Sequence, residues 1–107
     1  MAKVLISPGK YVQGAGEMKK LGEYAQNYGK KALILISKGG YKRIGAMVEK
    51  SFEGKECGYV FDYFNGECSK KEIKRLGEIV KKEACDVVIG IGGGKIFDTA
   101  KAVAYYE

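Results

Sequence analysis

The 107-residue sequence contains no histidine and only three cysteines. Histidine is the commonest general acid–base and a frequent ligand of catalytic zinc, so its absence removes the usual means of both functions. The cysteines, Cys57, Cys68 and Cys85, are odd in number and match no zinc-ligand spacing. We therefore expect reduced structural thiols and no metal site within this chain.

Long apolar runs and clusters of one charge are also absent. No run approaches the roughly 20 residues of a membrane span, and residues 1–8 lack the pattern of a secretory signal. We expect a cytoplasmic protein with no membrane contact. The 19 basic and 13 acidic residues give a net charge of +6. Because the lysines are spread over all the predicted helices, this charge indicates solvated helix faces and no nucleic-acid partner.

The residues that are present suit one globular domain. Hydrophobic residues make up 46% of the sequence and charged residues 30%, which is a typical globular composition. A chain of this length can bury a core, but it is too short for two domains. We find no internal repeat, linker or low-complexity segment.

Four apolar runs predict strands, and a segment with helical periodicity follows each of them. The strands are expected at residues 4–6, 32–36, 57–63 and 87–91, and the helices at residues 17–28, 44–52, 69–84 and 95–105. Residues 10–16 are expected to form a loop or a short extended piece. Residues 32–36 are continuously apolar, which is typical of a parallel strand covered on both faces. The alternation predicts an α/β fold, an open, mostly parallel sheet of about four strands with helices on both faces, as in a partial Rossmann-like nucleotide-binding domain.

Three predicted loops lie at the carboxyl ends of these strands, where ligands bind in such sheets. They are residues 37–40, 64–69 and 92–95. After the second loop, Ser69 and Glu72 have the spacing of a capping box at a helix start. The carboxyl edge of the sheet is therefore the predicted site.

The third loop is a strand–glycine–helix turn, in which Gly92, Gly93 and Gly94 follow a buried strand. Glycines permit positive φ and close approach of a ligand, and a helix N-terminus favours negative charge, so the turn suits a phosphate. It is not a P-loop, because isoleucines stand at positions 89 and 96 where that motif needs glycine and Ser/Thr. A Gly-x-Gly-x-x-Gly reading fails as well. The alternative is that the glycines only allow close strand–helix packing.

Three segments together carry a family resemblance. Residues 92–102 read GGGKxxDTAKA, residues 7–14 read SPGKYVQG, and residues 66–73 read GECSxxEI. This pattern closely resembles the glycerol dehydrogenases of the group III metal-dependent alcohol dehydrogenase family, and the likeness covers all 107 residues. The resemblance implies that residues 1–107 are the N-terminal part of a dinucleotide-binding domain and that the C-terminal, metal-binding helical domain is absent.

The resemblance also implies an activity. Members of the family oxidise glycerol to dihydroxyacetone with NAD and with zinc held by Asp and His ligands in the part that this chain lacks. We therefore expect a truncated glycerol dehydrogenase that is inactive alone and has no catalytic residue. The alternative is a non-catalytic module that oligomerises, or that binds a nucleotide, phosphate or other anion weakly, because a partial sheet exposes its edges. Either way, a homo-oligomer is expected.

Six residues are assigned to the cofactor site by the resemblance. Gly92, Gly93, Gly94 and Lys95 form the turn that binds the NAD pyrophosphate. Asp98 is either a hydrogen-bond partner that shapes the loop or a surface carboxylate in the first helical turn. Ser37 stands where the family usually presents a carboxylate to the adenine ribose, and position 96, commonly threonine, is Ile. Both departures indicate weakened cofactor binding.

Overall fold

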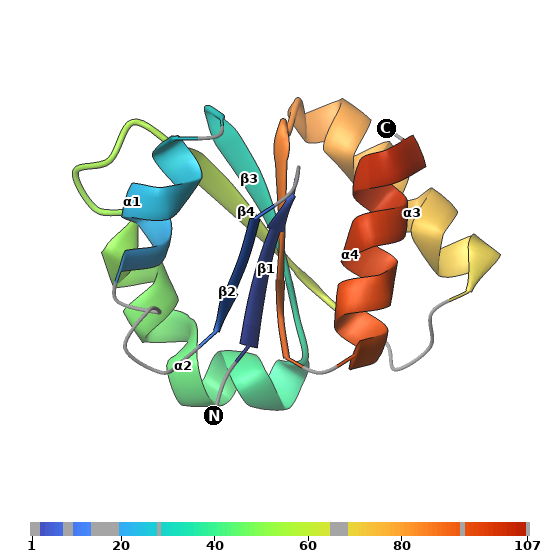
Figure 1. Cartoon of the computed structure of the whole chain (residues 1–107), viewed down its shortest axis with the longest axis horizontal. Helices are drawn as coiled ribbons and strands as arrows, with labels where there is room; N and C mark the ends of the chain where they lie inside the picture. The colour runs from blue at the N-terminus through green and yellow to red at the C-terminus, as the bar shows by residue number, and fades with distance from the viewer. Residues whose placement is uncertain are drawn as a thin grey trace.

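The structure is a computed structural model that describes residues 3–7, 10–13, 20–27, 29–64, 69–92 and 94–106, with side chains described from residue 20 to residue 103 within these ranges (Figure 1). The elements are β1 Lys3–Ser7, β2 Lys10–Gln13, α1 Leu21–Gln26, β3 Lys31–Ile36, α2 Lys38–Ser51, β4 Gly58–Tyr63, α3 Lys70–Glu83, β5 Val87–Ile91 and α4 Gly94–Tyr106. No helix in these ranges is long and apolar enough to cross a membrane.

The strands form one five-stranded sheet in the order β2-β1-β5-β3-β4. β3 lies between β5 and β4 and runs parallel to both, while β1 runs antiparallel to β2 and to β5. The predicted α/β class is confirmed, and the sheet has five strands where about four were expected, because residues 10–13, expected as part of a loop or a short extended piece, form β2. Only two residues separate β1 from β2, which is too short for a parallel crossover, so the pair is an antiparallel hairpin.

The two faces of the sheet carry separate cores. Along β3, Ala32, Ile34 and Ile36 pack on one face, and Leu33 and Leu35 pack on the other. In Figure 1, α1 and α2 cover the first face and α3 and α4 the second. All five of these side chains are fully buried. This confirms the doubly covered strand that the continuous apolar run predicted.

Two serine caps define where the helices begin. Ser37 Oγ accepts a hydrogen bond from the Gly40 N–H at 3.0 Å, and α2 begins at Lys38. The predicted loop at residues 37–40 is therefore wrong, because the cap starts the helix before its apolar periodicity becomes visible. Ser69 Oγ accepts from the Glu72 N–H at 3.1 Å, as the capping box predicts.

Some predictions fall on residues that the structure leaves out. The helix expected at residues 17–28 is described only as α1, and Cys68 and most of the loop at residues 64–69 lie outside the described residues. Cys57 and Cys85 are buried and free, and burial raises the pKa of both thiols. That matches the expectation of unreactive, reduced cysteines. The outer edge of β4 has no paired strand among the described residues, and the homo-oligomer stays a prediction.

The amino end of β3 is anchored by Asp86. Its carboxylate accepts the N–H of Lys30 at 2.9 and 3.0 Å and the N–H of Lys31 at 3.0 Å. A carbon added at Gly29 would lie only 2.3 Å from Asp86 Oδ1, so a glycine is needed there. Partial burial raises the pKa of this carboxyl, but the hydrogen bonds from Lys31 and Lys30 outweigh it and lower the pKa overall.

We predict that Asp86→Asn lowers the free energy of unfolding by about 1 kcal/mol at neutral pH, because it removes a charged acceptor. The folded-state pKa is depressed, so the stabilisation is complete above the unfolded value of about 3.9 and is lost as pH falls through the folded value. Urea unfolding from pH 7 to pH 3 should show the gap between wild type and variant closing below about pH 4. Glu78→Gln, at an exposed position on α3, is the control. A gap that does not depend on pH would contradict the role of the charge.

Candidate functional site

The candidate site lies where the carboxyl ends of β3 and β5 meet. Ile36 and Ile91 are register partners in this parallel pair, so Ser37 and Gly92 follow them side by side. Figure 1 shows α2 and α4 both beginning at this edge of the sheet, and they cover opposite faces. This divergence is a topological switch point, the place where open α/β sheets bind ligands.

The glycine turn requires a glycine at its first position. Gly92 has a φ of +142°, which other residues rarely adopt. Gly93 lies outside the described residues. Gly94 is the first residue of α4, and both Lys95 and Asp98 are exposed in the first turns of that helix. Gly92, Gly94 and Lys95 therefore lie together at the end of β5, and the Lys95 side chain is open to solvent.

Close packing is a second reason for the glycines. A carbon added at Gly92 would lie 2.7 Å from Ile96 Cδ1, and one added at Gly90 would lie 3.2 Å from Ala100 Cβ and 3.3 Å from Ile96 Cγ2. Ile96 is buried, so its side chain lies on the strand and is not available to a ligand. Close packing therefore accounts for Gly92 in the turn and also for Gly90, which precedes the turn.

Ser37 forms the other side of the site. Its Oγ accepts the Gly40 N–H as the cap of α2, which leaves the hydroxyl proton free to be donated to another acceptor. The next residue, Lys38, is exposed. Ser37 was assigned to the site by the family resemblance, and the structure adds that its hydroxyl caps the start of α2.

A hollow that the sequence did not reveal lies beside Ser37. It has a volume of about 490 Å³ and is lined by Lys38, Tyr63, Phe64 and Arg75. The Phe64 N–H donates to the Ile36 carbonyl at 2.9 Å, which joins the hollow to the end of β3. Tyr63 is 41% exposed, and Lys38 Nζ lies 5.9 Å from its ring centroid. The aromatic alternation along β4 was the only sequence signal for this surface.

Arg75 closes one side of the hollow. Its guanidinium pairs with Asp62 Oδ1 at 2.9 Å and with Glu72 Oε1 at 2.8 Å. The hydrogen bonds to Glu72 outweigh the effect of burial and, with Asp62, hold the pKa of the guanidinium above its usual value. Glu72 is only 2% exposed, so these pairs fix α3 against the end of β4. Sequence reasoning read Glu72 as part of a capping box and missed this network.

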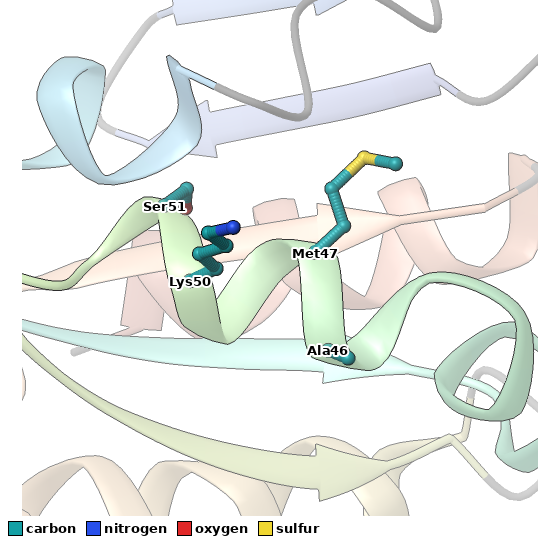
Figure 2. Close-up of a pocket in the computed structure, with 4 residues that line it drawn as sticks. All are labelled: Ala46, Met47, Lys50 and Ser51. Carbon is teal, nitrogen blue, oxygen red and sulfur yellow. The ribbon is translucent and has the colours of Figure 1, made fainter.

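A second hollow, of about 620 Å³, lies along the outer part of α2 and is lined by Ala46, Met47, Lys50 and Ser51 (Figure 2). These side chains come from the second half of the helix, whereas Ser37 precedes its first residue. Ser51 Oγ accepts from the Gly22 N–H at 3.1 Å and joins α1 to α2. This hollow is therefore separate from the site at the switch point.

The chain is an open α/β sheet with a glycine turn and a capped helix at its switch point, the place where such sheets bind ligands. Residues 8–107 match the family model described as iron-containing alcohol dehydrogenase. The chain belongs to that family, as the predicted resemblance implied.

Several relatives are glycerol dehydrogenases. The chain is 43% identical over 108 residues to the glycerol dehydrogenase of Escherichia coli O6:H1, covering 99% of this chain and 29% of that protein. It is 44% identical over 112 residues to the glycerol dehydrogenase of Thermotoga maritima, covering 98% and 28%. The crystal structure of a probable glycerol dehydrogenase from Sinorhizobium meliloti 1021 matches with a TM-score of 0.69 and 38% identity, over 84% of this chain and 23% of that one. The chain thus spans less than a third of the length of these relatives.

The family description implies a metal, and the residues that the structure describes do not fit one. The sequence has no histidine, and no group of three or more Cys, Asp or Glu side chains in the described ranges is placed to hold a metal ion. The fit to a nucleotide is better, because Gly92 and Ser37 lie together at the switch point.

We predict that Gly92→Ala costs about 2–3 kcal/mol of unfolding free energy, because it adds a contact with Ile96 to the strain of a positive φ. Gly54→Ala is the matched control, since Gly54 has a φ of +72° and nothing within 4 Å of an added carbon. That variant should cost about 1–2 kcal/mol. Equal losses for the two variants in urea unfolding would contradict the packing role of Gly92.

Proposed function

We propose that this chain is the nucleotide-binding part of a glycerol dehydrogenase-type oxidoreductase and that the crevice between β3 and β5 binds a nicotinamide dinucleotide. The observation that carries the proposal is the register of Ile36 with Ile91, which places Ser37 beside Gly92. These are the two points that the resemblance assigns to the ribose and to the pyrophosphate. The glycine turn follows β5, and the Ser37 cap follows β3. Because the two lie side by side at a switch point, one ligand can contact both.

Each residue then has a proposed role. The backbone N–H groups of the turn at residues 92–95 hold the pyrophosphate, aided by the N-terminus of α4. Lys95 adds a solvent-exposed cation, and Asp98 shapes the turn. Ser37 contacts the adenosine ribose. When bound, the nicotinamide ring supplies hydride-accepting chemistry.

We propose the complete reaction, oxidation of glycerol, only for a protein that has the full length of the relatives. We do not propose it for this chain alone. The described residues offer no site for the family's metal, and the sequence has no histidine to act as a general acid–base. We therefore propose that the isolated chain is inactive. Incubated with glycerol, NAD and zinc, it should give the rate of a blank without protein, and turnover clearly above that blank would contradict the proposal.

We predict weak, saturable binding of NAD and ADP, with affinities no better than high micromolar, because Ser37 replaces a carboxylate and the chain spans only part of its relatives. Lys95→Ala should weaken ADP binding about 3–10-fold by removing a charge-assisted contact to phosphate. Isothermal titration calorimetry on the full chain measures both effects.

Lys101→Ala is the control for that titration, because Lys101 is also exposed on α4 but lies almost two turns further along the helix. Its affinity for ADP should equal that of the wild type. No saturable binding of either nucleotide, or the same loss in both lysine variants, would contradict a pyrophosphate site at the glycine turn.

A further inference from the structure

We infer that the crevice selects an adenine dinucleotide that carries a phosphate on the 2′-oxygen of its adenosine ribose, and that Ser37, Lys38 and Arg43 determine this selectivity. The inference rests on the proposed function and adds to it the chemical class of the cofactor. Under this inference, the absence of a carboxylate at the end of β3 is what permits the 2′-phosphate to bind.

The first observation is the chemistry at the end of β3. A carboxylate at this point of a dinucleotide fold accepts hydrogen bonds from the ribose hydroxyls and repels a 2′-phosphate. Ser37 carries no charge, and its Oγ already accepts the Gly40 N–H at 3.0 Å. Its remaining proton is therefore a donor, and a phosphate oxygen is an acceptor. The residue suits a 2′-phosphate better than it suits two ribose hydroxyls.

The second observation is a pair of exposed cations in the first turns of α2. Lys38 follows Ser37 directly, and its Nζ lies over the Tyr63 ring. A carbon added at Gly39 would lie 3.8 Å from Nη1 of Arg43, so this guanidinium lies back along the helix toward its first turn. Within the described part of the chain, neither cation pairs with a carboxylate. Both are therefore available to an anion beside Ser37.

The third observation is room for the group. The hollow of about 490 Å³ begins at Lys38 and continues between Tyr63, Phe64 and Arg75. The carboxylates nearest to it, Asp62 and Glu72, share the single positive charge of Arg75, which leaves one negative charge. Lys38, which also lines the hollow, offsets that charge, so the positive charge in excess on this side is that of Arg43.

The test compares three nucleotides by calorimetry on the full chain at one fixed, low salt concentration. We expect NADP to bind about tenfold more tightly than NAD, because the two share the pyrophosphate and differ only in the 2′-phosphate, and charge-assisted contacts to one phosphate supply an effect of about that size. The 3′-phosphate isomer of NADP has the charge of NADP with the phosphate on the neighbouring oxygen. It should bind about as weakly as NAD.

Variants assign the effect to residues. Ser37→Asp keeps a good helix cap and should reverse the preference in favour of NAD. Lys38→Gln and Arg43→Gln should each remove about threefold or more of the preference while leaving NAD affinity nearly unchanged. Lys42→Gln is the matched control, an exposed cation on the same helix, and it should leave the preference intact. Circular dichroism confirms that each variant is folded.

The outcomes separate this inference from the proposed function. If NAD binds as tightly as NADP, or if the 3′-phosphate isomer binds as tightly as NADP, the inference is overturned and the dinucleotide site stands. If Lys42→Gln lowers the preference as much as Lys38→Gln, general charge explains it and the inference is likewise overturned. If none of the nucleotides binds, the proposed function fails together with the inference.

Discussion

The parallel pairing of β3 with β5 is the constraint on which the rest of the structure depends. It buries the central apolar strand on both faces, and its register sets Ile36 beside Ile91. From there the chain leaves in two directions, into α2 on one face and α4 on the other. Because the two helices diverge from neighbouring strand ends, this edge is the switch point of the sheet, where open α/β sheets bind ligands. A slip of one residue would turn the buried side chains to the wrong face, so the packing that stabilises the fold also fixes the geometry of the site.

The glycines next to α4 have a packing role that is compatible with the proposed binding role. Gly90 and Gly92 lie under Ile96, and their lack of side chains lets α4 approach β5. Ile96 is buried, so it supports the turn and is not free to contact a ligand. The proposed selectivity is therefore assigned to the β3 side, where Ser37, Lys38 and Arg43 lie.

Much of this arrangement was predictable from local patterns, because those patterns reflect burial. The continuous apolar run at residues 32–36 predicted a doubly covered strand, and the strand–glycine–helix turn predicted the second half of the site. The β1–β2 hairpin was missed because its short segments have little periodicity. The start of α2 was missed because Lys38, Gly39 and Gly40 are poor helix indicators, and only the Ser37 cap reveals it. The Arg75 network joins β4 to α3, and no spacing along the chain predicts such a tertiary contact.

The claim that the β3–β5 crevice is the nucleotide site is tested most directly by following the backbone amide signals of the full chain by NMR during an ADP titration. The account predicts that the largest shift changes fall at residues 37–40 and 92–95, with the second half of α2, around the hollow at Ala46 and Ser51, unaffected. Changes centred on that hollow, or scattered over the lysine-rich helix surfaces without a focus at the two strand ends, would contradict it.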